Sequence, residues 1–144
     1  MILFCDTSAL MKAYANEQYS EQVRSLLEEA AGCFVSLITW TEMCSAFGMK
    51  ERTQQITGAE VAAGLERLNK EWGSFGQTAV DAALVTEAGE LALRFGLRAY
   101  DSVQLASVQR VHKQLGSNLV FCCFDRQLNA AAKALKIKRF PIVI

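Results

Sequence analysis

The sequence contains few of the residues on which zinc sites and disulfide frameworks depend. Histidine occurs once, at His112, far from every cysteine, and the five cysteines include no Cys-x-x-Cys pair. This gives no sign of a zinc site, and an odd number of cysteines is a poor basis for a set of disulfides. Cys5, Cys33, Cys122 and Cys123 lie in apolar, strand-like stretches, so we expect reduced core thiols in a reducing compartment.

Net charge and long hydrophobic runs are also missing. The 15 basic and 15 acidic residues give a formal charge of zero. A protein of this kind binds nucleic acid through a local patch or metal ions and not through a general basic field. No uncharged stretch approaches the roughly 20 residues needed to span a bilayer, so we expect no membrane association. The N-terminus lacks the basic region and cleavage site of a secretory signal, which favours the cytoplasm.

The remaining composition is that of a folded domain. Hydrophobic residues make up 51% of the 144 residues and charged residues 21%, which argues against disorder. This length suffices for one domain with a sizeable core but not for two. There is no repeat, low-complexity segment or linker, so residues 1–144 are expected to form a single domain.

Hydrophobic patterning predicts strands that alternate with helices. Strands are expected at residues 1–5, 33–38, 77–80, 119–124 and 140–144. Helices are expected around residues 9–13, 19–31, 39–50, 57–72, 81–95 and 128–135, with another that begins at Asp101. This alternation predicts an α/β fold in which a parallel sheet is flanked by helices on both faces. The only proline, Pro141, falls in the last strand and suits an edge position.

Four acidic residues are expected at one edge of this sheet. Asp6 and Asp125 each follow a strand, Glu42 lies one turn into the helix after the second strand, and Asp101 opens a helix. The carboxyl edge of a parallel sheet is where ligands bind. Clustered carboxylates repel one another and must protonate, spread apart or bind a cation. Oxygen ligands without His or Cys favour Mg²⁺ or Mn²⁺.

Each acid also has a purely structural interpretation. Asp6, Asp101 and Asp125 could serve as N-caps, because Asp accepts hydrogen bonds from the first amides of a helix. Thr39-x-x-Glu42 fits a capping box, in which the glutamate bonds back to the first backbone amide. The shared edge favours a joint role, but these alternatives stay open for each residue taken singly.

Four segments resemble the acidic motifs of PIN-domain ribonucleases, most closely the VapC-type toxins of toxin–antitoxin modules. They are Asp-Thr-Ser-Ala-Leu (6–10), Thr-Glu-Met-Cys-Ser-Ala (41–46), Leu-Arg-Ala-Tyr-Asp-Ser-Val-Gln-Leu-Ala (97–106) and Phe-Asp-Arg-Gln-Leu (124–128). The resemblance covers essentially the whole chain, and residues 98–106 are its most specific part. It implies a PIN-like fold in which Asp6, Glu42, Asp101 and Asp125 hold a divalent metal for RNA cleavage. Cys123 departs from the pattern, since such proteins often have Thr or Ser there.

The expected reaction is hydrolysis of RNA phosphodiester bonds by metal-activated water, which needs no protein nucleophile. Arg98 and Arg126 stand next to acids, and Lys12 lies on the first helix, so these three could hold RNA phosphates. Surface salt bridges are the alternative for each. His112 is expected in a solvated or packing role.

Large apolar residues are numerous for so small a domain. Most should belong to the core, but the resemblance implies that some form a homodimer face or a groove for an antitoxin helix. The residues concerned are Trp40, Met43, Phe47, Met49, Trp72 and Phe75.

Three other classes of protein also place acids at strand ends. A receiver-type phosphoacceptor normally needs paired acids after the first strand and a lysine after the last, and both are absent. An Asp-x-Asp phosphatase would need an acid at Ser8. A non-catalytic PIN-like binding module is compatible with the pattern but would more readily have lost one of the four acids.

Overall fold

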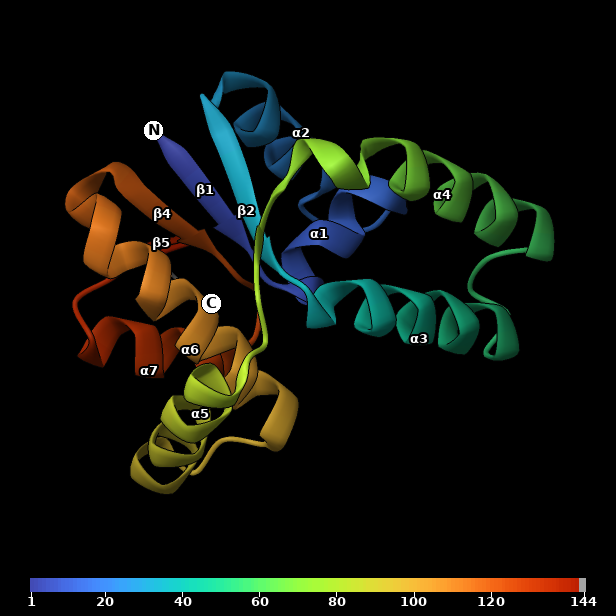
Figure 1. Cartoon of the computed structure of the whole chain (residues 1–144). Helices are drawn as coiled ribbons and strands as arrows, with labels where there is room; N and C mark the ends of the chain where they lie inside the picture. The colour runs from blue at the N-terminus through green and yellow to red at the C-terminus, as the bar shows by residue number, and fades with distance from the viewer. Residues whose placement is uncertain (143–144) are drawn as a thin grey trace.

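Five strands form one parallel sheet in the order β3-β2-β1-β4-β5 in the computed structural model, which describes residues 1–142 (Figure 1). The strands are β1 (Ile2–Cys5), β2 (Gly32–Ser36), β3 (Gly76–Thr78), β4 (Leu119–Cys122) and β5 (Lys138–Phe140). The predicted α/β fold with a parallel sheet is therefore confirmed. Receiver-type modules have the order 2-1-3-4-5 instead, so the receiver-like alternative is wrong.

The helices connect the strands as the alternation predicted. They are α1 (Thr7–Tyr14), α2 (Ser20–Glu29), α3 (Ile38–Arg52), α4 (Gly58–Glu71), α5 (Ala82–Phe95), α6 (Ala99–Leu115) and α7 (Arg126–Ala134), with short 3-10 turns at Trp72–Ser74 and Gly116–Asn118. Thr57 starts α4 through a capping box with Glu60. Gly96 ends α5 with a φ of 66°, a conformation that glycine adopts without strain. Over residues 1–142, none of the helices combines the length and apolarity needed to cross a membrane.

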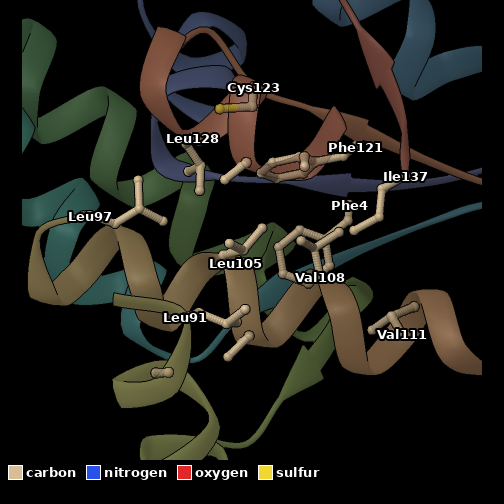
Figure 2. Packing of buried hydrophobic residues seen from close by; sticks show 14 of the residues in the cluster. Phe4, Leu91, Leu97, Leu105, Val108, Val111, Phe121, Cys123, Leu128 and Ile137 are labelled. Carbon is tan, nitrogen blue, oxygen red and sulfur yellow. The ribbon is translucent and has the colours of Figure 1, made fainter. Parts of the chain in front are cut away.

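Alternate residues of the central strands face two separate hydrophobic clusters, because side chains point to opposite faces along a strand. Phe4 and Phe121 pack against α5, α6 and α7, and Figure 2 shows their rings beside Leu105 and Val108 of α6. Leu3 and its neighbours on the other face pack against α1 to α4. Helices thus cover both faces of the sheet, as predicted.

Helices α3 and α4 lie side by side and extend away from the sheet (Figure 1). Their contact depends on Gly64, since a Cβ there would lie 2.7 Å from the ring of Phe47. Met43 and Phe47 are buried, which confirms them as core residues. Met49 is 56% exposed, so it does not belong to the core. Trp40, Trp72 and Phe75 are half-buried and stacked edge to face.

Several expected boundaries shift. The predicted strand at 77–80 is β3, at Gly76–Thr78, and the last strand is Lys138–Phe140 where 140–144 was expected. Pro141 follows β5, which is an edge strand, and residues 143–144 lie outside the described residues. The hydrophobic pattern did not predict β5 at this position, because two of its residues are charged and an edge strand tolerates polar side chains. All five cysteines are free thiols. Cys5, Cys122 and Cys123 are buried as expected, whereas Cys33 is only half-buried.

Candidate active site

The strand order changes direction between β1 and β4, and in such sheets the carboxyl ends at this point form a crevice. Asp6 follows β1 and Asp125 follows β4 three residues after its end. The backbone amide of Asp6 donates to the carbonyl of Cys122 over 3.2 Å, which keeps the two strand ends together. Asp6 and Asp125 are also N-caps of α1 and α7, so these acids combine the capping role with a place at the crevice.

Asp6 is a buried carboxylate, only 4% exposed. It accepts hydrogen bonds from the amide of Ala9 at 3.0 Å, from Ser8 Oγ at 2.7 Å and from Cys123 Sγ at 3.2 Å. Burial raises the pKa of Asp6 to about 6; these hydrogen bonds oppose the rise and the nearby charge of Glu42 adds to it. Its hydrogen-bond partners within residues 1–142 are all neutral, so its negative charge is left without a counter-ion there.

Glu42 is fixed by side chains from two other helices. Its Oε1 accepts from Thr7 Oγ1 at 2.9 Å and from Gln104 Nε2 at 2.7 Å. The capping-box interpretation is wrong, because α3 begins at Ile38 and Thr39 already lies inside the helix, where its hydroxyl bonds to Gln104. Since Thr7 follows Asp6 directly, the hydrogen bond from Thr7 places Glu42 beside the first acid.

Asp101 and Asp125 share one arginine. The expectation that Asp101 opens its helix is wrong, because α6 begins at Ala99 and the cap position is Arg98. Arg98 Nε instead lies 3.1 Å from Asp101 Oδ2, and Arg98 Nη2 lies 3.9 Å from Asp125 Oδ2. Hydrogen bonding to Asp101, followed by the charges of Asp101, Asp125 and Glu42, raises the pKa of the guanidinium. Asp101, Asp125 and Glu42 therefore act on the same guanidinium, and Glu42 also acts on Asp6.

Cys123 occupies the position where Thr or Ser was expected. Its thiol donates to Asp6, and its sulfur accepts from the amide of Asp125 at 3.4 Å. It also belongs to the hydrophobic cluster and lies beside Leu128 in Figure 2. Burial and the charge of Asp6 raise the pKa of the thiol, so it stays protonated and acts as a donor. This residue links the first acid to the last.

The acidic side chains are better suited to a hydrated Mg²⁺ or Mn²⁺ ion than to an ion enclosed entirely by protein ligands. Within residues 1–142, no three or more His, Cys, Asp and Glu side chains lie close enough to hold an ion by themselves. Mg²⁺ usually keeps several waters and binds through one or two carboxylates, so wide spacing of the acids is compatible with it. The uncompensated charge of Asp6 favours a cation at this position.

The three basic residues expected at the site differ in their surroundings. Arg98 is 79% exposed although it contacts two of the acids. Lys12 lies 3.2 Å from Glu17 and 4.6 Å from the ring centroid of Phe124, so the salt-bridge interpretation is confirmed for it. Arg126 is exposed next to Asp125 and has no acidic group within 4 Å among the residues that the structure covers.

Gln104 is the main residue of the site that sequence reasoning missed. It is 1% exposed, and its amide nitrogen bonds to Glu42 and Thr39. A signal was present, because Gln104 is a polar residue within an apolar stretch and lies three residues after Asp101, on the same side of the helix. Thr7 and Ser8 belong to the first motif, but only the structure shows which acids they bind.

Comparison with known proteins places these features in a family. The PIN domain family model matches residues 3–134. The chain is 29% identical over 133 residues to Ribonuclease VapC46 of Mycobacterium tuberculosis, a match that covers 92% of each chain.

Two solved structures share the fold. One is the VapC20 toxin of Mycobacterium tuberculosis, described as cleaving the sarcin–ricin loop, with 17% identity, a TM-score of 0.66 and coverage of 90% of this chain and 94% of that one. The other is a toxin–antitoxin complex from Klebsiella pneumoniae, with 21% identity, a TM-score of 0.59 and coverage of 87% of each chain. Because the family model covers nearly the whole chain, including all four acids, this protein is a member of the PIN domain family.

Proposed function

We propose that this protein is a divalent-metal-dependent endoribonuclease. The observation that carries the proposal is a set of contacts that joins the four acids Asp6, Glu42, Asp101 and Asp125 through Thr7, Cys123 and Arg98. The similarity to Ribonuclease VapC46 supports RNA as the substrate, and the all-oxygen donor set supports Mg²⁺ or Mn²⁺ as the cofactor.

In this proposal one or two of the four carboxylates would bind the metal directly and the others would act through its bound waters. Bound Mg²⁺ or Mn²⁺ supplies Lewis-acid activation of water and neutralises charge on the phosphate. Hydrogen bonds from Ser8 and Cys123 orient Asp6, and those from Thr7 and Gln104 orient Glu42. With a pKa of about 6, Asp6 is ionised at pH 7 and above, the form that binds a cation.

Basic residues at the crevice would bind the RNA backbone. Arg98 is exposed and can exchange its carboxylate partners for a phosphate, which guanidinium binds in a bidentate manner. Arg126 stands at the start of α7 beside Asp125 and is free to do the same. Lys12 contributes only where its ion pair with Glu17 opens.

We also propose that the protein is the toxin of a toxin–antitoxin module, forms a homodimer and is held inactive by an antitoxin protein. The structural likeness to a chain of the Klebsiella pneumoniae toxin–antitoxin complex supports this assignment. Leu37 and Met49 of the α3 region are exposed, and Trp40 beside them is half-buried, so this region offers apolar surface to a partner.

The direct test is RNA cleavage by purified protein freed of any partner. Cleavage should require Mn²⁺ or Mg²⁺, stop in EDTA and be lost in Asp6→Asn, which keeps a capping side chain. Asp81→Asn is the matched control, because Asp81 caps α5 but contacts none of the four acids. Cleavage that continues in excess EDTA, or that survives in Asp6→Asn, contradicts the proposal; a metal-binding but inactive protein would favour a non-catalytic PIN-like module.

A further inference from the structure

The chain beyond Asp125 is entirely basic in its charged residues. It has no Asp or Glu and five basic residues: Arg126, Lys133, Lys136, Lys138 and Arg139. Within residues 1–142 none of the five lies within 4 Å of an acidic group, whereas five of the ten earlier Lys and Arg residues do, namely Lys12, Lys50, Lys70, Arg98 and Arg110. In a protein with no net charge, this separation creates a local positive surface.

Four of these residues border one recess where α7 meets the edge strand β5. Lys133, Lys136, Lys138 and Arg139 surround it, and the aliphatic side chains of Val120 and Ile137 also line it. Its volume is about 550 Å³, and it is shallow and open to solvent. We call this hollow the basic recess. Cationic walls with an apolar lining match a nucleotide, which has a charged phosphate and a flat apolar base face.

The backbone of Lys136 provides a way to test a binding role. Its φ is 60°, in the left-handed region, at the position after α7 where glycine is favoured. Its amide donates to the carbonyl of Lys133 at 2.9 Å, and Ile137 donates to Ala132 at 3.1 Å, which closes the helix. Folding alone would favour glycine here. A change of Lys136 to glycine therefore removes the ammonium without disturbing the turn.

Protection of an exposed sheet edge accounts for only part of the pattern. Lysine on an edge strand prevents pairing with other chains, and this explains Lys138. It does not explain Lys133, which is on α7, or the strained Lys136, which is in the turn. A binding role accounts for all three.

We propose that the basic recess binds phosphates of the same RNA strand that is cleaved at the four acids. Arg126 and Lys133 lie on one exposed face of α7, seven residues apart, and connect the two sites. The helix spans about 14 Å, which a stacked strand covers in roughly four nucleotides. This proposal rests on the proposed ribonuclease function and adds a second contact region for the substrate.

The test uses Lys136→Gly, which should move stability and RNA binding in opposite directions. Glycine relieves the left-handed strain, so the melting temperature should rise, while loss of the ammonium weakens binding of a labelled single-stranded RNA in EDTA several-fold. The slope of log Kd against log salt concentration should fall by about one. Gln54→Gly is the matched control, because Gln54 also has a φ of 60° but lies at the end of α3. It should gain stability and leave RNA binding unchanged.

A second set of variants keeps the turn intact. Lys133→Gln combined with Lys138→Gln should weaken RNA binding further, and Lys113→Gln at an exposed position of α6 should not. Unchanged RNA affinity in Lys136→Gly and in the double variant overturns the proposal. Binding of polyglutamate at the recess in preference to RNA overturns it as well, in favour of an acidic protein partner.

The two proposals fail separately. If wild type binds RNA through the recess but cleaves none with Mn²⁺, the recess is an RNA-binding site and the ribonuclease proposal is wrong. If wild type cleaves RNA and the recess variants bind it normally, only the recess proposal is wrong.

Discussion

Replacing Asp6 with Asn tests whether this buried carboxylate lacks a counter-ion in the metal-free protein. The side chain is 4% exposed, and burial raises its pKa from the ordinary 3.8 to about 6. Asn caps a helix about as well as Asp, so the amide of Ala9 keeps an acceptor. The substitution therefore removes the charge and leaves most of the local structure in place.

The sign and size of the effect follow from the pKa. Below about pH 4 the Asp6 carboxyl is protonated in the folded and the unfolded protein, so it does not make the free energy of unfolding depend on pH. Between pH 4 and 6 the unfolded chain releases its proton first, so the free energy of unfolding decreases as pH rises. Above pH 6 the ionised Asp6 lowers the free energy of unfolding by its full amount, up to about 3 kcal/mol for a pKa difference of two units. Asp6→Asn should therefore melt up to roughly 6–12 °C higher than wild type at pH 7.5 in EDTA.

The measurement is thermal and urea unfolding of both proteins from pH 4 to pH 8 in EDTA. Asp81→Asn is the control, because Asp81 also caps a helix but Arg110 holds its pKa below the usual value. The stabilisation by Asp81 is complete above its ordinary pKa and is lost in acid, so Asp81→Asn should be slightly less stable at pH 7.5. Excess Mn²⁺ should stabilise wild type more than Asp6→Asn. An Asp6→Asn protein that is no more stable than wild type at pH 7.5, with no pH dependence of the difference, would refute the reasoning.

Three further predictions concern residues around the site and the core. Gln104→Met should weaken Mn²⁺ binding by about 10–100-fold in calorimetry, because Glu42 loses the hydrogen bond that positions it. The melting temperature in EDTA should change little, because the substitution also removes a buried oxygen without a hydrogen-bond partner. An unchanged Mn²⁺ affinity would exclude this positioning role. Arg98→Gln should bind Mn²⁺ more tightly, since no guanidinium then competes for the acids, and should raise the KM for RNA; weaker Mn²⁺ binding would contradict this. Gly64→Ala should destabilise the fold by about 1–3 kcal/mol in urea unfolding, because its Cβ would clash with a buried ring. Gly89→Ala is the control for Gly64→Ala: it has open space around it and should add up to about 1 kcal/mol of stability.

Strong local signals predicted most of the fold. The apolar runs before Asp6 and Asp125 formed β1 and β4, and Thr57 and Gly96 bounded their helices as expected. Weak strands were placed less well, because β3 and β5 are edge strands whose position depends on pairing with β2 and β4. Pairing between distant segments leaves little trace in a local pattern.

The sequence alone could not show which acids cap helices and which belong to the site. A capping acid and a site acid have the same sequence context, and Asp6 and Asp125 prove to be caps at the crevice. At Glu42 the capping box was a false signal, because α3 begins earlier than its Thr suggested. Repulsion among the acids was expected, but Arg98 offsets it at Asp101 and Asp125 and leaves Asp6 uncompensated.

The sequence by itself determined the fold class, the positions of Asp6 and Asp125 after strands, and the oxygen-only character of the donor set. These depend on periodicity and residue type, which are local properties of the chain. Only the tertiary structure decided which hydrogen bonds hold each acid, that Gln104 of α6 reaches Glu42 of α3, and that one arginine lies between Asp101 and Asp125. Those contacts join residues up to 117 positions apart, such as Cys123 and Asp6, and arise only when the packing of the whole domain brings them together.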